Sequence, residues 1–219
     1  MQTIILLGPP GVGKGTAAQG LMRSADFTHV STGDMLREAI KSGTSLGKIA
    51  KAYMDKGELV PDEVIMEIVQ KRLNQGLSAA KYMFDGFPRT LEQARLFDAL
   101  LVSKQTQLTK VFILDATREI LLERLAGRRI CKNCGAVYHV KRKPPKQEGI
   151  CDHCQGEVYQ RIDDKEKTIL NRLAIFRKQT EGLIDYYKNR DLVIRIDARQ
   201  DPEVIKAIIL EALDIHDKD

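Results

Sequence analysis

Short runs of apolar, β-forming residues alternate along the chain with longer segments of helical periodicity. Four such runs are residues 3–7, 81–84, 110–114 and 192–196, and a shorter fifth run precedes Ser31. Residues 4–7 and 111–114 are apolar at every position, which is typical of strands buried on both faces of a sheet. The alternation predicts an α/β fold in which helices flank a parallel five-stranded sheet.

Proline residues indicate where several helices begin. Pro202 after Asp201 predicts a helix capped by Asp201, and Pro61 predicts another helix that ends near Gln75. Residues 127–164 interrupt the pattern, because they contain all four cysteines and a Pro-Pro pair and show no helical period. We therefore expect these residues to form an insert with a small architecture of its own.

Length and composition fit one main domain. A chain of 219 residues with 43% apolar side chains can bury a sizeable core without disulfides. The sequence begins without a basic leader, and its apolar runs fall short of the roughly 18 residues of a membrane helix. We expect a cytoplasmic protein with no membrane contact, for which a monomer suffices.

The spacing of the cysteines predicts a metal site. Cys131 and Cys134 are separated by two residues, as are Cys151 and Cys154, with sixteen residues between the pairs. This is the spacing of a four-cysteine zinc site, in which four thiolates leave no open position for water. The zinc is therefore expected to be structural, and His153 is expected to be a surface residue. A redox role for each pair is the weaker alternative.

The positive charge does not require a nucleic-acid partner. The formal charge is +5, which would suit a phosphate backbone. Four zinc-bound thiolates and one Zn²⁺ would lower it by two. Aromatic residues make up 5% of the chain and Trp is absent, so surfaces for base stacking are few. The balance favours a protein that binds the phosphates of small nucleotides.

The loop after the first apolar run carries a phosphate-binding motif. Residues 8–16 read GPPGVGKGT and lead into a helical stretch from Ala17. Glycines let backbone N–H groups converge on phosphate oxygens, and Lys14 reaches the β and γ phosphates. Gly15 stands where Ser or Thr usually follows the lysine, and Thr16 supplies the hydroxyl one place later. A glycine-rich turn without a ligand is the alternative, which the strand, lysine and helix together disfavour.

This variant of the loop resembles that of the nucleoside monophosphate kinases, and of the adenylate kinases in particular. Further motifs follow in the same order: STGDMLR at 31–37, DGFPR at 85–89 with Gln93, and GRR at 127–129. The resemblance covers nearly the whole chain. It implies a P-loop NTPase-type core of residues 1–30, 61–126 and 165–219, a helical monophosphate-binding insert at 31–60, and a small zinc-binding lid at 127–164.

The resemblance also implies an activity: reversible, Mg²⁺-dependent transfer of the terminal phosphoryl group from ATP to AMP, giving two ADP. It places ATP at Gly11, Val12, Gly13, Lys14, Gly15, Thr16, Arg124, Arg128, Val137, Tyr138 and Gln200. It places AMP at Thr32, Arg37, Glu58, Leu59, Val60, Gly86, Phe87, Pro88, Arg89, Gln93, Arg161 and Arg172. The catalytic set is Lys14, Arg89, Arg124, Arg128, Arg161 and Arg172.

Residue chemistry supports several of these assignments. Arg37 and Arg89 offer planar forks for a phosphate dianion, and the Gln93 amide can both donate to and accept from an adenine edge. Arg37 as a solvated charge and Gln93 as a solvated helix residue are the alternatives. Asp85 ends a predicted strand, where a carboxylate can hold Mg²⁺ through water; a cap on the next turn is the alternative.

Asp163 and Asp164 stand where the insert rejoins the core. They are candidates for hinge-side partners of the lid arginines. For Asp164, an N-cap of the long helix to Lys188 is an equal alternative.

Two other functions remain open. One is a sibling enzyme, a GTP:AMP phosphotransferase or another nucleoside monophosphate kinase. The other is a zinc-containing, nucleic-acid-binding protein that uses nucleotide as a switch.

Overall fold

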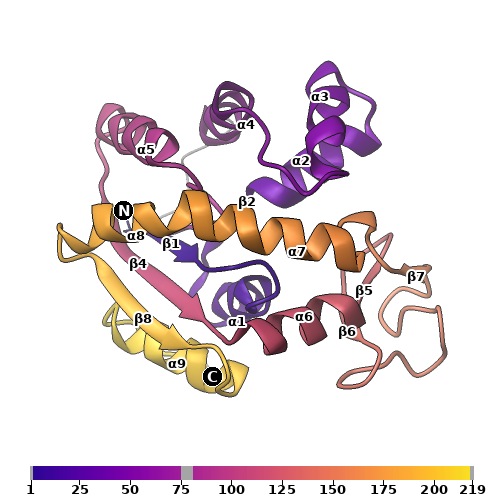
Figure 1. Ribbon diagram of the computed structural model, residues 1–219. Coiled ribbons are helices and arrows are strands. Elements are labelled where there is room, and N and C mark those ends of the chain that lie inside the picture. The colour runs from indigo at the N-terminus through magenta and orange to yellow at the C-terminus, as the bar shows by residue number, and fades with distance from the viewer. Residues whose placement is uncertain (1, 75–80, 218–219) are drawn as a thin grey trace.

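A computed structural model describes residues 2–74 and 81–217. Figure 1 shows a central sheet covered by helices on both faces. The sheet is parallel and five-stranded, with the order β2-β3-β1-β4-β8, as the sequence predicts. Its strands are β1 (Gln2–Leu7), β2 (Thr28–Ser31), β3 (Lys81–Asp85), β4 (Leu108–Asp115) and β8 (Val193–Asp197).

Both faces of the sheet are buried, which explains the uninterrupted apolar runs. On β1, Ile5 and Leu7 face one core, whereas Ile4 and Leu6 face the other, and all four are at most 2% exposed. The first core continues into α4 (Asp62–Asn74), α5 (Leu91–Ser103) and α8 (Glu181–Lys188). The second continues into α1 (Lys14–Ala25) and α9 (Pro202–Glu211).

Side-chain caps fix the starts of several helices. Asp201 caps α9, because its carboxylate accepts a hydrogen bond from the Glu203 N–H, as predicted. Ser31 and Thr44 cap α2 (Thr32–Lys41) and α3 (Ser45–Met54) in the same way. Helix α4 begins one residue after Pro61, as expected. Its predicted end near Gln75 lies outside the described residues.

The long helix expected before Lys188 is interrupted. Helix α7 (Glu166–Ile175) passes into a π-helical segment, Phe176–Thr180, and then into α8. The N-cap of α7 is Lys165, and Asp164 belongs to a 3₁₀ turn, Ile162–Asp164. The alternative role of Asp164 as the helix cap is therefore wrong.

The cysteine-containing insert forms a small antiparallel sheet of its own. After α6 (Arg118–Gly127), strands β5 (Arg128–Cys131), β6 (Val137–His139) and β7 (Val158–Tyr159) pair in the order β6-β5-β7. In Figure 1 this sheet and the α2–α3 pair stand out from the core on the side where α7 begins. Among the described residues, no helix is long and apolar enough to cross a membrane.

Candidate active site

The loop between β1 and α1 takes a shape that requires glycine. Gly13, the N-cap of α1, has φ 112°, in the left-handed region that side chains disfavour. At Gly8 a Cβ atom would lie 2.3 Å from the carbonyl oxygen of Leu114 on β4. Because α1 begins at Lys14, the positive end of the helix dipole points at this loop. The local geometry is that of an anion-binding loop.

Lys14 lies at the centre of the loop. Its Nζ atom donates hydrogen bonds to the carbonyl oxygens of Gly8 at 2.8 Å and Pro9 at 3.1 Å. Burial lowers the pKa of Lys14 to about 8; the charge of Asp85 opposes this shift, and the nearby Arg89 adds to it. A phosphate group beside the amine would favour its charged form.

Asp85 ends β3 and faces the same loop. Leu6 of β1 and Asp85 are paired in the sheet, and the Oδ2 atom of Asp85 lies 3.9 Å from the Cβ position of Gly15. The N–H of Gly86 donates to the Leu6 carbonyl at 3.4 Å, so a backbone hydrogen bond holds the start of the next turn. A carboxylate beside the phosphate loop is a fitting ligand for Mg²⁺, directly or through water.

Sequence reasoning missed the neighbour of Asp85. His29 of β2 brings its Nε2 atom to 3.4 Å from Oδ2 of Asp85. The contact arises because Val30 pairs with Phe84 in the sheet, which places His29 next to the strand end. No local signal marks it, since the strand order must be known first.

The residues predicted to bind the acceptor are organised around Arg89, four residues after the end of β3. The Arg89 N–H donates to the Gln93 Oε1 atom at 2.8 Å, and its Nε donates to the Gly86 carbonyl at 2.6 Å. Gln93 in turn donates to Oδ1 of Asp62 at 2.6 Å. Gln93 is 2% exposed, so its interpretation as a solvated helix residue is wrong. One amide hydrogen and one carbonyl lone pair of Gln93 are left by these bonds.

Other predicted acceptor residues converge on the same region. The Thr32 hydroxyl donates to the Gly86 carbonyl at 3.2 Å, which ties the start of α2 to the end of β3. Phe87 is fully buried in the first core and packs edge-on against Phe97 at 5.1 Å between ring centroids. These contacts hold the segment of residues 86–89 between the start of α2 and the first core.

The segment with Glu58, Leu59 and Val60 joins α3 to α4 and is anchored on α7. The Asn171 side chain donates to the Lys56 carbonyl at 2.7 Å. A Cβ atom at Gly57 would lie 2.9 Å from both Thr168 and Arg172, so the segment lies closely against α7. Asn171 was not among the predicted residues.

Asp164 joins the arginines of the insert and of α7. Arg128 donates to both of its carboxylate oxygens, at 2.7 and 2.6 Å, and Arg172 donates to one of them at 3.1 Å. Arg172 also pairs with Asp163 at 3.0 Å. Asp164 is 1% exposed, whereas the side chains of Arg128 and Arg172 are half-buried. The geometry of these contacts supports the hinge-side interpretation of both aspartates.

The predicted arginines that contact the α2 region are held by Asp34. Arg37 pairs with Asp34 at 2.5 Å, and Arg161 approaches the same oxygen at 3.7 Å. The solvated alternative for Arg37 is only partly right, because its side chain is 28% exposed. Burial lowers the pKa of Arg161 to about 10, and the charge of Arg37 adds to this effect.

The centre between the loop and α7 holds an excess of positive charge. The pKa of Arg89 is lowered to about 10, first by burial and then by the charge of Arg172. For Arg128, burial also lowers the pKa, but the hydrogen bonds and charge of Asp164 outweigh it and leave the pKa above its ordinary value. Buried cations that lower one another's pKa form a site that anions stabilise.

Arg124, one of the residues predicted to bind the donor, bridges two loops. Its Nη1 atom donates to the Val12 carbonyl at 3.0 Å and its Nη2 atom to the Ala198 carbonyl at 2.9 Å. The turn with Ala198 also contains Gln200, whose N–H donates to the backbone carbonyl of Asp197 at 3.3 Å. Arg124 therefore connects the phosphate loop with the turn after β8.

The two residues of the insert that are predicted to contact ATP differ in exposure. Val137 is 37% exposed, whereas Tyr138 is 2% exposed and lies inside the small sheet. The Tyr138 hydroxyl accepts a hydrogen bond from the Asp152 N–H at 2.8 Å and lies 3.3 Å from Cys151 Sγ. Contact between Tyr138 and a nucleotide base would have to come from its backbone.

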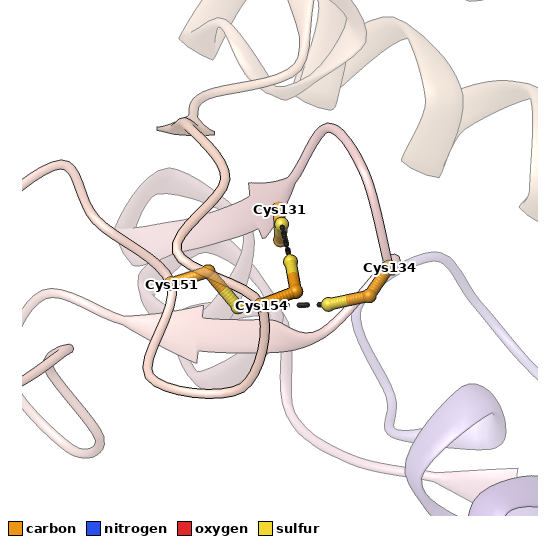
Figure 2. Close-up of side chains that lie close together, drawn as sticks. All are labelled: Cys131, Cys134, Cys151 and Cys154. Atoms are coloured by element: carbon orange, nitrogen blue, oxygen red, sulfur yellow. Dashed lines mark hydrogen bonds between the residues drawn. The ribbon is translucent and has the colours of Figure 1, made fainter.

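The four cysteines converge, as Figure 2 shows, with one pair on each of two loops. All four thiols are free, and their sulfur atoms lie within 4.8 Å of one another. Two of the sulfur pairs are 3.4 and 3.5 Å apart. Zn–S bonds of about 2.3 Å in a tetrahedron place sulfurs about 3.8 Å apart, so the cluster fits zinc.

The two cysteine loops repeat one turn geometry. In each, the N–H two residues after the first cysteine, of Asn133 or His153, points at the sulfur of that cysteine at 3.4 Å. Gly135 supplies the left-handed residue of the first turn, with φ 73°. In the second turn Gln155 takes this conformation, with φ 59°. His153 is exposed, as predicted.

The strand order, the glycine-rich loop at the head of α1 and the buried cations around it define a P-loop phosphotransferase. The family model described as Adenylate kinase matches residues 6–192. An adenylate kinase of Caldicellulosiruptor bescii is 48% identical over 213 residues, which cover 95% of this chain and 99% of the relative. One of Carboxydothermus hydrogenoformans is 48% identical over 210 residues, covering 96% and 98%. The chain therefore belongs to the adenylate kinase family.

Proposed function

We propose that this member of the family transfers the terminal phosphoryl group of Mg²⁺-bound ATP reversibly to AMP, giving two ADP. The observation that carries the proposal is the cluster of buried cations between the phosphate loop and α7. The charge of Arg89 lowers the pKa of Lys14, so the two cations lie within electrostatic reach of each other. A site that binds the phosphates of two nucleotides accounts for this charge.

The donor is assigned to the loop side. Backbone N–H groups of residues 11–16 and the Lys14 amine would bind the ATP phosphates, and Arg128 would approach them when the insert closes. The base would lie near Gln200 and the backbone of Val137 and Tyr138. Arg124 supports this assignment, because its contacts already join the phosphate loop to the Gln200 turn.

The acceptor is assigned to the segment of residues 86–89, which follows β3. Arg37 and Arg89 would bind the AMP phosphate, and the remaining donor and acceptor of Gln93 would read the adenine edge. Thr32 and residues 58–60 would border the nucleoside. Arg161 and Arg172 would complete the set around the transferring group.

Chemistry in such a site needs positioning and charge neutralisation more than acid or base catalysis. The second pKa of a phosphate monoester is about 6, so the AMP phosphate is already largely a dianion at neutral pH. When Mg²⁺ is bound with ATP, it supplies charge neutralisation, and Asp85 would hold it, through water. The arginines would stabilise the charge that spreads over the transferring group.

We assign the two outlying segments to closure over the nucleotides. Residues 31–60 would cover AMP and residues 127–164 would cover ATP, which excludes water that would hydrolyse the γ-phosphate. Lid closure of this kind is a known property of adenylate kinases in general. Zinc on the four cysteines would give the lid a core, because its apolar cluster is small: Cys131, Tyr138 and Cys151 with two partly buried neighbours.

A coupled assay tests the proposal and its rivals. ADP formation is measured with ATP and AMP, CMP, UMP or GMP in turn, and then with GTP and AMP. We expect ATP with AMP to be the fastest pair. A GTP preference would identify a GTP:AMP phosphotransferase, and ATP hydrolysis indifferent to AMP would favour the nucleotide-switch alternative.

We further propose that the protein acts as a monomer in the cytoplasm without a nucleic-acid partner. Four free thiols suited to zinc fit a reducing compartment. Sedimentation with and without nucleotides tests whether the protein is a monomer. Sedimentation with an oligonucleotide at low salt tests whether it binds nucleic acid.

A further inference from the structure

The π-helical segment before α8 ends at a buried hydroxyl. Thr180, its last residue, is 2% exposed. Its Oγ1 atom donates to the carbonyl oxygen of Arg89 at 3.1 Å, across 91 positions of sequence. A buried hydroxyl bound to one backbone carbonyl of a distant loop is a specific contact, because a buried polar group without a partner is costly.

The interruption of the helix sets the direction of Thr180. Leu173 on α7 packs against the second core, whereas Leu183 and Tyr187 on α8 are fully buried in the first core. The π segment accommodates this change of packing face. Thr180 lies three and seven residues before Leu183 and Tyr187, so it shares their face and meets the loop after β3. Such segments occur frequently at functional sites.

With this contact, both polar groups of the Arg89 backbone are hydrogen-bonded to side chains. Gln93 accepts from the Arg89 N–H, and Thr180 donates to the Arg89 carbonyl. Buried side chains bind both the N–H and the carbonyl of Arg89, so the backbone position from which its side chain extends is fixed. Its Nε bond to Gly86 then sets the direction of the fork.

We propose that Thr180 is a positioning residue for the acceptor phosphate, acting through Arg89. The inference rests on the proposed function, in which Arg89 binds AMP. Phosphoryl transfer is sensitive to displacements of about 1 Å in the groups that position substrate. Loss of this hydrogen bond should therefore weaken the productive binding of AMP and leave the ATP side unchanged.

The test uses a matched pair of variants. Thr180→Val keeps the shape and removes the hydroxyl, whereas Thr180→Ser keeps the hydroxyl. Steady-state kinetics give kcat and the KM values for AMP and for ATP. For Thr180→Val we expect the KM for AMP to rise about tenfold, the size of one hydrogen bond, with the KM for ATP unchanged. Thr180→Ser should stay close to wild type.

Several results would overturn the inference. Equal effects of the Val and Ser variants would indicate a packing role for Thr180. A parallel rise in the KM values for AMP and ATP would indicate general destabilisation. An unchanged KM for AMP in Thr180→Val would show that Arg89 needs no such support. Thr180→Ala provides the same comparison if the Val variant does not fold. Arg89→Lys separates the role of Thr180 from the AMP-binding role of Arg89 on which it rests. If this variant is active and its KM for AMP is unchanged, the assignment of Arg89 to AMP itself fails.

Discussion

Asp164 offers the sharpest test of how the cation cluster is held together. Its side chain is fully buried and accepts three hydrogen bonds from Arg128 and Arg172, at 2.7, 2.6 and 3.1 Å. Asp164→Asn keeps the volume but removes the charge and turns one acceptor into a donor. Both guanidinium groups would then lack their shared carboxylate.

The expected cost follows from this geometry. Removal of one partner from a buried ion pair costs about 3–5 kcal/mol, and the retained amide oxygen favours the lower end. A loss of about 3 kcal/mol corresponds to a melting temperature roughly 6–12 °C lower for a protein of this size. The matched control is Asp197→Asn, which removes a carboxylate that binds Arg199 at the surface, where solvent screens the pair.

Urea and thermal unfolding of wild type, Asp164→Asn and Asp197→Asn provide the assay. The Asp164 variant should unfold at clearly lower urea concentration, and the Asp197 variant close to wild type. Equal stability of Asp164→Asn and wild type, or an equal loss in both variants, would refute the reasoning.

Three further predictions concern the loop and the metal. Lys14→Ala should abolish phosphoryl transfer and leave the melting temperature nearly unchanged; transfer near the wild-type rate would contradict the assigned role. Because bound phosphate favours the charged form of a lysine whose pKa is about 8, ATP binding should take up protons near pH 8 and weaken as the pH rises further. Calorimetry in buffers of different ionisation enthalpy measures this uptake, which Lys14→Ala should eliminate. Chelation of zinc should lower the melting temperature more than it lowers activity in the cold, whereas early loss of both together would argue against a structural metal.

Features encoded within short stretches of sequence were predictable. Apolar runs indicated the buried strands, the glycine and lysine spacing indicated the phosphate loop, and the paired cysteines indicated a zinc site. Each depends on a few consecutive residues whose side chains or backbone angles determine the outcome.

Contacts between distant elements were not predictable in the same way. His29 beside Asp85 depends on strand pairing, and Thr180 beside Arg89 depends on a π-helical interruption that leaves no trace in the periodicity. Gln93 had the polarity of a surface residue, and its hydrogen bonds with Asp62 and the Arg89 backbone explain its burial. Such partners are chosen by packing, after the elements have formed.

The central claim is direct passage of a phosphoryl group from one bound nucleotide to another. The most direct measurement follows the label from [γ-³²P]ATP incubated with the protein, Mg²⁺ and unlabelled AMP. The account predicts that the label appears in the β position of ADP at the rate at which AMP is consumed. Release of the label as inorganic phosphate, at a rate that AMP does not change, would contradict it.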